Sequence, residues 1–550
     1  MLRSGVDPDQ GCESGRQRTI GCGRPSCGVS GLLKVTLVAG VLAATGTMAP
    51  GRERQLLTGA LLIAMATVAF EGTVVGAALP SIAGELQGVD LYPWVFSGYL
   101  LTTTTTAPLY GKLADTFGRR PVFFVGLGLF TLGTFLCGAA PSMTLLVLAR
   151  LLQGAGAGAV MPLTLTVLGD IYTIEERVRV QAVTSSLWAF FSVVGPSGGA
   201  LVVQYATWRW VFWSNLPFCV GALALLFVYL RERTSPRELP IDFAGALTLT
   251  GALTCVLVVA LEGGRSLPWG SGAMAVTLAG AAVLFGAFAF VEGRAPDPVL
   301  PFDALTLRPV AVGNLGNVVV GFANFLPTTF VPLLVQGARG GDALATGSVL
   351  TALGAAWSLT AVVSGRIFLV LGFRRSAIAG TAGIFAGTGV VAASAALDLP
   401  TAVLAVGMGV AGCGLGMSST AFLYAPQVSV PWNRRAAVTS STQFARNVAG
   451  AVAVAIAGGW LNAQLLDGAV ARGIEPLRAV NVVSQMLSPT GRAGVPPDVG
   501  QALAVTLGSG LVSIFAVLAA LAGAGVIAML VFARDLVPDA AGGRPAASPE

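Results

Sequence analysis

The feature that most constrains this sequence is a succession of apolar segments, each about as long as a helix that crosses a lipid bilayer. Such a helix needs roughly 20 mainly apolar residues. Inside lipid, only helices and closed barrels satisfy all their backbone hydrogen bonds, and the short alternating segments of a membrane barrel are not seen here. Charged residues make up 11% of the 550-residue chain, whereas soluble domains carry about 25%. The sequence therefore predicts an all-α membrane protein.

Fourteen apolar segments are candidates for membrane-spanning helices. Their approximate bounds are 56–79, 92–110, 121–140, 142–168, 180–204, 209–230, 242–261, 272–291, 309–334, 344–370, 376–397, 400–425, 437–462 and 504–532. We expect disorder in the polar N-terminal extension, 1–55, and in the Pro-, Ala- and Gly-rich tail, 537–550. The sequence leaves open whether residues 1–47 are translated, since Met48 is an alternative start.

Basic residues distinguish the two sides of the membrane. If the N-terminus is cytoplasmic, most Lys and Arg residues of the short loops fall on the inner side. This is the positive-inside pattern of membrane proteins. It predicts a multi-pass protein of the plasma (inner) membrane with both termini in the cytoplasm. A long loop, 463–503, then lies outside.

Two similar segments follow the second and the tenth spans. They run from Gly111 to Arg120 and from Gly365 to Arg375, and each has two glycines seven residues apart and a basic doublet. Parallel repeats of this kind are a transporter architecture. We therefore expect two six-helix bundles, 56–231 and 301–536, with two inserted helices and their linkers in 232–300.

The first of these segments has features beyond a topology signal. Gly111 permits a close helix contact, and Gly118 suits a turn with a positive φ angle. Asp115 and Arg119 are four residues apart, the spacing of a side-chain pair on a helix. The simpler alternative is that Arg119 and Arg120 only anchor the loop at the inner membrane surface.

Glu71 is the carboxylate that lies well inside a predicted span, the first, and Arg150 lies well inside the fourth. Such groups are costly in lipid and normally face protein or a water-filled cavity. Burial favours the neutral form of a carboxylic acid, whereas a neighbouring guanidinium favours its charged form. A carboxyl under both influences can load and release a proton. The alternatives are an arginine that binds backbone carbonyls and a glutamate capped by nearby hydroxyls.

The fifth and sixth spans carry further motifs. In the fifth, Pro196 removes a helix hydrogen bond and bends the chain, and the glycines around it, Gly195, Gly198 and Gly199, allow tight packing. A plain kink is the alternative. The sixth span begins with Trp208-Arg209-Trp210, an aromatic anchor of the kind found at membrane interfaces.

In their order and spacing, these motifs resemble those of the major facilitator superfamily, and within it the fourteen-helix drug:proton antiporter group. The resemblance runs from about residue 52 to 536. It departs from the group at four positions, where Glu71 replaces Asp, Gly76 replaces Asn, and Phe191 and Ala200 replace Gly. These departures leave the direction of transport less securely implied than the fold.

The resemblance implies a major facilitator fold and an exporter of small amphipathic organic molecules that exchanges them for protons by alternating access. Glu71 and Arg150 would couple transport to protons. The segment from Gly111 to Arg120 would be a cytoplasmic gating loop, and the motif around Pro196 would seal the protein against proton leak.

A substrate pocket between the two bundles, lined mainly by apolar groups, would suit amphipathic molecules. Our candidate lining residues are Trp188, Asn317, Asn324, Trp357 and Arg446. Core packing, or hydrogen bonding across helices, is the alternative role for these side chains. An importer or facilitator of a metabolite is the alternative function, and a membrane sensor or scaffold that transports nothing is another.

The chain contains no histidine, which excludes a His-bearing zinc site and a Ser-His-Asp triad. We therefore predict no enzymatic activity, no catalytic residues, no metal and no cofactor. No basic run interleaved with aromatic residues points to nucleic acid. The expected partners are a small-molecule substrate, protons and the lipid bilayer, and we expect a monomer.

Overall fold

The computed structural model of the chain describes residues 51–231, 243–264, 266–294, 305–431, 434–472, 475–487, 491 and 494–533. Our expectations for the N-terminal extension up to residue 50 and for the C-terminal tail lie outside the described residues.

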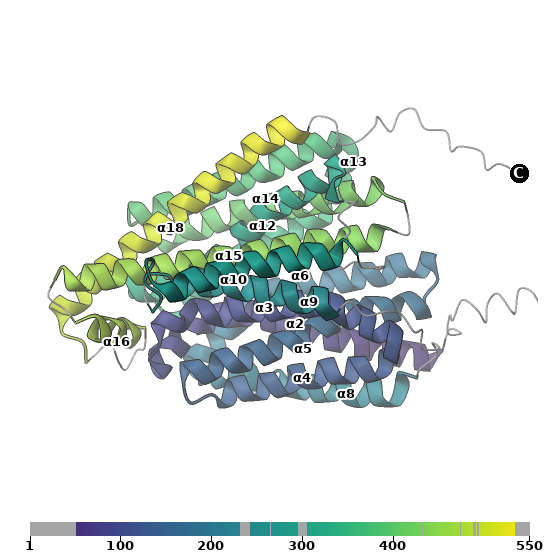
Figure 1. Cartoon of the computed structure of the whole chain (residues 1–550), viewed down its shortest axis with the longest axis horizontal. Helices are drawn as coiled ribbons and strands as arrows, with labels where there is room; N and C mark the ends of the chain where they lie inside the picture. Colours follow the sequence, from purple (N-terminus) through teal and green to yellow (C-terminus); the bar gives the residue numbers. More distant parts are fainter. Residues whose placement is uncertain are drawn as a thin grey trace, which may run out of the picture. The chain divides into compact units, whose positions relative to one another are not determined.

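The described residues are almost entirely helical (Figure 1), and the β-type pairing among them is an isolated bridge between Gly263 and Leu267. The helices of the N-terminal half are α2 (Arg52–Leu86), η1 (Val89–Leu91), α3 (Tyr92–Phe117), α4 (Arg119–Ala139), α5 (Met143–Ile171), α6 (Ile174–Tyr205), α7 (Arg209–Trp213) and α8 (Leu216–Tyr229).

The second part of the chain continues in the same manner. The inserted pair and the C-terminal half comprise α9 (Phe243–Glu262), α10 (Gly272–Glu292), α12 (Arg308–Pro332), the π-helical η2 (Leu333–Ala338), α13 (Ala343–Ala396), α14 (Thr401–Val428), α15 (Arg435–Val470), α16 (Pro476–Met486) and α18 (Pro497–Phe532). The all-α membrane fold expected from the sequence is confirmed.

Thirteen helical segments in the described residues are long and apolar enough to cross a membrane. The predicted span that is missing from these thirteen is the second, 92–110, which corresponds to α3, a helix of 26 residues. Its run of threonines, Thr102–Thr106, makes it less apolar. Two of these hydroxyls bond to backbone carbonyls of α5: Thr103 donates to Gly154 at 3.1 Å, and Thr106 donates to Ala155 at 3.2 Å. These two hydroxyls of α3 are thus accommodated by α5.

Glycines with positive φ angles occupy equivalent positions in the two repeated segments. Gly118, at φ +92°, separates α3 from α4, and Gly372, at φ +74°, interrupts α13 between its two membrane spans. Residues with a Cβ are disfavoured in this region. The sequence repeat therefore corresponds to a repeated backbone turn.

The helix α9, which we expected to be one of two inserted helices, packs on α3 and α15. A Cβ atom on Gly459 of α15 would meet the carbonyl of Ala260, and one on Gly458 would meet Pro93 of α3 and Leu261 of α9. Small residues let membrane helices approach closely, since lipid supplies no hydrophobic drive for association. The helix α9 therefore lies against both α3 and α15.

Hydrogen bonds join the two halves toward the end of the bundle where α2 leads into α3. They include Gln336 to the Ala77 carbonyl, Tyr92 to the Thr329 carbonyl, Asn462 to the Asp90 carbonyl, Ser197 with Thr351 and, deeper in the bundle, Ser192 with Ser358. Each bond gives a polar group the hydrogen-bond partner that lipid could not supply. This end of the bundle is closed.

The segment that we expected as a long outer loop is largely helical. The helix α15 continues to Val470, and α18 already begins at Pro497. Between them, α16 buries an apolar face that includes Ala479, Val483 and Met486. It also reaches the N-terminal half, because the Ser484 hydroxyl accepts a hydrogen bond from the Val89 amide at 3.2 Å.

Candidate proton-coupling and substrate site

The two ionisable residues predicted to act together form a buried ion pair. Arg150 of α5 donates from Nη1 to Oε1 of Glu71 in α2 at 2.8 Å, although the two residues are 79 positions apart in the sequence. Glu71 is 0% exposed and Arg150 is 1% exposed. Without its partner, either charge would be strongly unfavourable at this depth.

Arg150 is held by several other groups. It donates from Nη1 to Gln153 Oε1 at 2.6 Å and from Nε to the Val95 carbonyl at 3.3 Å, and its guanidinium stacks over the Tyr99 ring at 4.3 Å. Charge-assisted hydrogen bonds and a cation–π contact offset part of the loss of hydration. The arginine is therefore fixed in one orientation.

A second layer supports these groups. Gln153 donates to the Thr134 hydroxyl at 2.9 Å, and Asn215 donates to the Thr67 carbonyl at 3.0 Å, beside Glu71. Gln153 follows Arg150 by three residues, so its position on the same helix face was accessible to sequence reasoning. Tyr99, Thr134 and Asn215 were not predicted as site residues, because they reach the pair only through packing of separate helices.

One oxygen of the Glu71 carboxyl remains without a partner. Oε2 is buried and accepts no hydrogen bond from the described residues, whereas Oε1 is bound by Arg150. Buried polar atoms are nearly always satisfied, so an exception calls for an explanation. A carboxyl with one occupied and one unoccupied oxygen can take a proton on the unoccupied side.

The Glu71 side chain points into the N-terminal half, toward α5. Residues of α2 just beyond it face other helices: Gly195 of α6 lies against Thr73, and Thr328 of α12 lies against Gly76. The helix that carries the buried carboxylate therefore also contacts the opposite half, one to two turns away.

The motif in α6 packs tightly against α2 and α13. A Cβ on Gly195 would collide with Thr73, and one on Gly199 would meet Val74. Pro196 lies within a continuous helix, and its carbonyl is next to Gly347 of α13. Gly198, in contrast, has open space where a Cβ would be. Three of the four motif residues thus lie at close helix contacts.

The predicted gating loop is connected to neighbouring helices. Arg119 forms an ion pair with Asp170 at the end of α5, so the spacing argument for Asp115 did not identify this partner. Gly118 breaks the helix between Asp115 and Arg119, and side-chain spacing rules do not extend across such a break. Arg120 donates to the Phe227 carbonyl of α8 at 3.0 Å. In the described part of the chain, a Cβ on Gly111 would meet no atom of another helix within 4 Å.

The five candidate substrate residues have different surroundings. Asn317 donates to the carbonyls of Gly313 and Phe422, which is hydrogen bonding across helices. The backbone of Trp357 lies beside Gly412 and Gly416 of α14, and Trp188 has a buried indole nitrogen without a partner among the described residues.

Asn324 and Arg446 are both partly exposed. They lie on neighbouring helices, since the Arg446 backbone approaches Gly321 of α12. Arg446 Nε is buried and has no hydrogen-bond partner among the described residues.

The aromatic motif that follows α6 is attached to the end of α2. Glu85 at the end of α2 accepts a hydrogen bond from Trp208 Nε1 at 2.9 Å and forms an ion pair with Arg209. The Arg209 guanidinium also lies 4.4 Å from the centre of the Trp208 ring. The interface role that we expected for this motif fits these contacts, and Glu85 had no sequence signal of its own.

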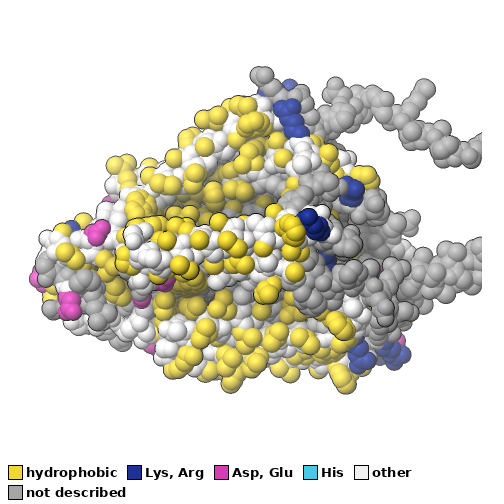
Figure 2. All heavy atoms as spheres, viewed as in Figure 1, with side chains coloured by type: hydrophobic (Ala, Val, Ile, Leu, Met, Phe, Trp, Pro, Cys, Tyr) yellow, Lys and Arg dark blue, Asp and Glu magenta, His cyan; other side chains and the backbone are white. Residues whose placement is uncertain are grey.

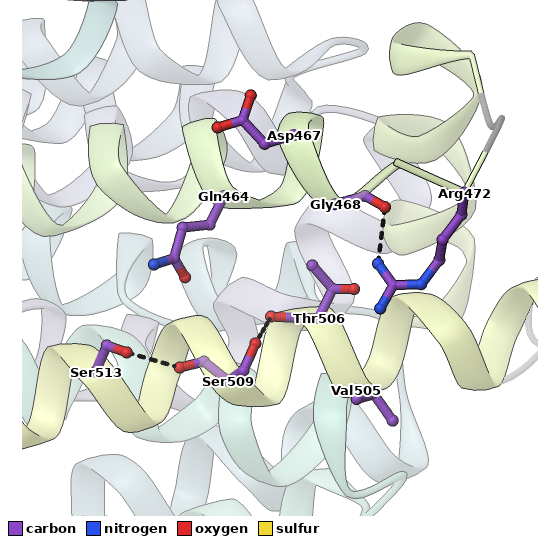
Figure 3. Close-up of a pocket in the computed structure, with 8 residues that line it drawn as sticks. All are labelled: Gln464, Asp467, Gly468, Arg472, Val505, Thr506, Ser509 and Ser513. Carbon is purple, nitrogen blue, oxygen red and sulfur yellow. Dashed lines mark hydrogen bonds between the residues drawn. The ribbon is translucent and has the colours of Figure 1, made fainter. Parts of the chain in front are cut away.

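A separate polar pocket of about 350 Å³ lies between α15 and α18 (Figure 3). Its lining includes Gln464, Asp467 and Arg472 from the α15 side and Thr506, Ser509 and Ser513 from α18. Arg472 donates to the Gly468 carbonyl at 2.7 Å. None of the residues predicted for the substrate site lines this pocket.

The chain is similar to known transporters in sequence. The family model of the Major Facilitator Superfamily matches residues 61–454. The multidrug transporter protein MdtP of Bacillus subtilis is 34% identical over 414 residues, covering 75% of this chain and 76% of the relative. Multidrug resistance protein 3 of the same species is 29% identical over 400 residues, covering 72% and 78%.

Solved structures agree on the fold. A POT family peptide transporter aligns with a TM-score of 0.60 at 15% identity, covering 90% of this chain and 99% of the other. A bacterial homologue of the lysosomal transporter Spinster aligns with the same score and identity, covering 90% and 100%. By its sequence and its helical fold, this chain belongs to the Major Facilitator Superfamily and is a multi-pass membrane transporter.

Proposed function

We propose that the protein exports small amphipathic organic molecules in exchange for protons. The observation that carries this proposal is the buried pair of Glu71 and Arg150, in which one carboxylate oxygen has no partner. Intramembrane ionisable groups of this kind are characteristic of proton relays. The efflux activity is supported by relatives named multidrug transporter protein MdtP and multidrug resistance protein 3.

The protein is oriented in the plasma (inner) membrane with both termini in the cytoplasm. Figure 2 supports this orientation: Lys and Arg side chains gather at one end of the visible face, and Asp and Glu side chains gather at the other, where α16 lies. Cytoplasmic loops carry the excess of basic residues. The end closed by hydrogen bonds between the halves is then the outer one.

A transport cycle follows from this arrangement. A proton from the outside binds Glu71, neutralises it and weakens its attraction to Arg150. The halves then rearrange to the inward-open state, where the proton leaves Glu71 to the cytoplasm, the ion pair re-forms and the substrate binds. The reverse rearrangement exposes the substrate to the outside, where it leaves. One side chain thus alternates between a charged, paired state and a neutral one.

Glu71→Gln tests the coupling. Glutamine keeps the shape of the side chain but cannot exchange a proton, so we expect efflux driven by an imposed proton gradient to fall to background. The measurement is transport of a panel of lipophilic compounds in vesicles with and without the gradient. Glu53→Gln, an exposed position on the same helix, is the matched control and should transport normally.

Two results would contradict the proposal. Retained gradient-driven efflux in the Glu71→Gln variant would exclude Glu71 as the coupling residue. Transport by the unaltered protein that survives collapse of the gradient would exclude proton antiport. Substrate uptake into cells, in place of efflux, would favour the alternative of an importer.

A further inference from the structure

We infer that the exporter prefers amphipathic anions, and that Arg446 binds their carboxylate. This inference rests on the proposed function and names the substrate class of the same transport site. It starts from a difference between the two arginines that lie well inside the described membrane spans.

Arg150 has a full set of partners, including a carboxylate, an amide oxygen, a carbonyl and an aromatic face. Arg446 has none of these. Among the described residues its Nε atom is buried without a hydrogen bond, and no carboxylate forms an ion pair with its guanidinium. An arginine can donate five hydrogen bonds, so this one has unused binding capacity.

The position of Arg446 is deep. It is eleven residues from the start of α15 at Arg435, and a helix rises about 1.5 Å per residue, which places it about 17 Å along the axis. The residue keeps some exposed surface in spite of this depth, although its Nε atom is buried. A charged group in the membrane normally faces protein or a water-filled cavity, and the partial exposure fits the second case.

The balance of charge in the interior is positive. Glu71 is the carboxylate that lies well inside the described spans, and Arg150 already neutralises it. The other carboxylates of these spans lie within about one turn of a helix end. Arg446 is therefore a cation without a fixed counter-charge, and an organic cation entering beside it would be repelled.

The surroundings suit a molecule with an apolar body. Phe325 of α12 lies against Gly450, one turn beyond Arg446 on α15, and Gly321 brings the two helix backbones together. Phe322 and Phe325 are partly buried apolar side chains. An aromatic or aliphatic body can pack on these rings while its carboxylate takes two parallel hydrogen bonds from the guanidinium.

The test uses two fluorescent probes that share an apolar body and differ in charge, 1-pyrenebutyrate and 1-pyrenebutyltrimethylammonium. Inside-out vesicles that contain the unaltered protein should accumulate the carboxylate under a proton gradient, and the ammonium at least about tenfold more slowly. Loss of one charged hydrogen-bonded contact corresponds to about ten- to hundredfold in binding. Arg446→Gln should therefore reduce pyrenebutyrate transport about tenfold or more, whereas Arg446→Lys should retain part of it.

Arg472→Gln is the matched control, because it removes an exposed arginine two residues beyond the end of the same helix, and it should leave transport unchanged. If the unaltered protein transports the ammonium as well as the carboxylate, the inferred substrate class is wrong but export stands. If it transports neither probe, and no compound of the lipophilic panel, the proposed function itself fails. This comparison needs no variant, so it decides the matter even if Arg446→Gln does not fold.

Discussion

At the scale of single residues, an ion pair offsets the unfavourable free energy of burying charged groups at membrane depth. Glu71 and Arg150 come from different helices and bury each other completely. Removing one member of such a pair leaves an uncompensated charge, whereas removing both leaves a neutral site. The pair therefore contributes to folding as well as to the proposed coupling.

A stability measurement separates these contributions. Arg150→Leu should destabilise the purified protein by about 3–5 kcal/mol, because the Glu71 carboxylate loses its partner. Adding Glu71→Leu should restore part of the loss. Thermal unfolding of the two variants in detergent checks this, and a double variant less stable than Arg150→Leu would contradict it.

A second residue-scale prediction concerns pH. Two hydrogen bonds from Arg54, at 2.8 and 3.1 Å, hold the pKa of Glu176 below its usual value near 4.5, as does a bond from the Thr173 amide. Because the pKa of Glu176 is lower in the folded protein than in the unfolded chain, the contact stabilises the start of α6 fully at pH values above the unfolded-state pKa. The stabilisation is lost as the pH falls through the lower, folded-state pKa.

Hydrogen exchange at the first turn of α6 measures this effect. Protection should be present at neutral pH and should decline below about pH 4.5 in the unaltered protein. Glu176→Gln should lack the added protection at neutral pH and show no such decline. Equal protection in the two proteins at neutral pH would contradict the prediction.

At the scale of helices, small residues determine which elements touch. In α5, Gly154 lies against α3, and Gly156 lies against the backbone of α4. Lipid provides no hydrophobic drive for helix association, so close contact and dispersion must supply it. The glycines of α5 therefore allow close packing on two faces of this helix, one against α3 and the other against α4.

We therefore expect valine to destabilise the protein at one glycine and to be tolerated at another. Gly156→Val should destabilise the protein by about 1–3 kcal/mol or more, since its side chain would overlap the backbone of Phe130. Gly128→Val on α4 should be tolerated, because nothing lies within 4 Å of a Cβ there. The yield of monodisperse protein and its thermal unfolding compare the two variants.

At the scale of the whole transporter, the closed end must open during transport. Ser197 of α6 and Thr351 of α13 bond directly at 2.6 Å between their hydroxyl oxygens. Alternating access requires the two halves to separate there when the other side closes. The contact is therefore a position at which the cycle can be blocked.

Replacing Ser197 and Thr351 together by cysteine should allow a disulfide that halts transport under oxidising conditions, and a reductant should restore it. The single variant Ser197→Cys should transport in both conditions. Efflux measured before and after reduction gives the result. Unimpaired transport by the cross-linked protein would show that these helices do not separate.

Much of the fold could be predicted from local sequence. Burial in lipid forces each apolar segment into a helix, so the segments themselves indicate the helices to within several residues. A positive φ angle was predicted for Gly118, and the structure has one there and also at Gly372, the equivalent position of the repeat. The ends of the helices were harder to predict from the sequence, because α16 and the outer parts of α15 and α18 depend on contacts with other elements.

Of the candidate site, the sequence alone determined which groups are chemically unusual: an acid and an arginine inside membrane spans, and glycines around a proline. Only the tertiary structure decided their partners. The pairing of Glu71 with Arg150, the pairing of Arg119 with Asp170 and, among the described residues, the lack of a partner for Arg446 Nε all arise between helices distant in the chain. Residue type sets the free energy of burying a charge, but the approach of separate helices decides how that charge is satisfied.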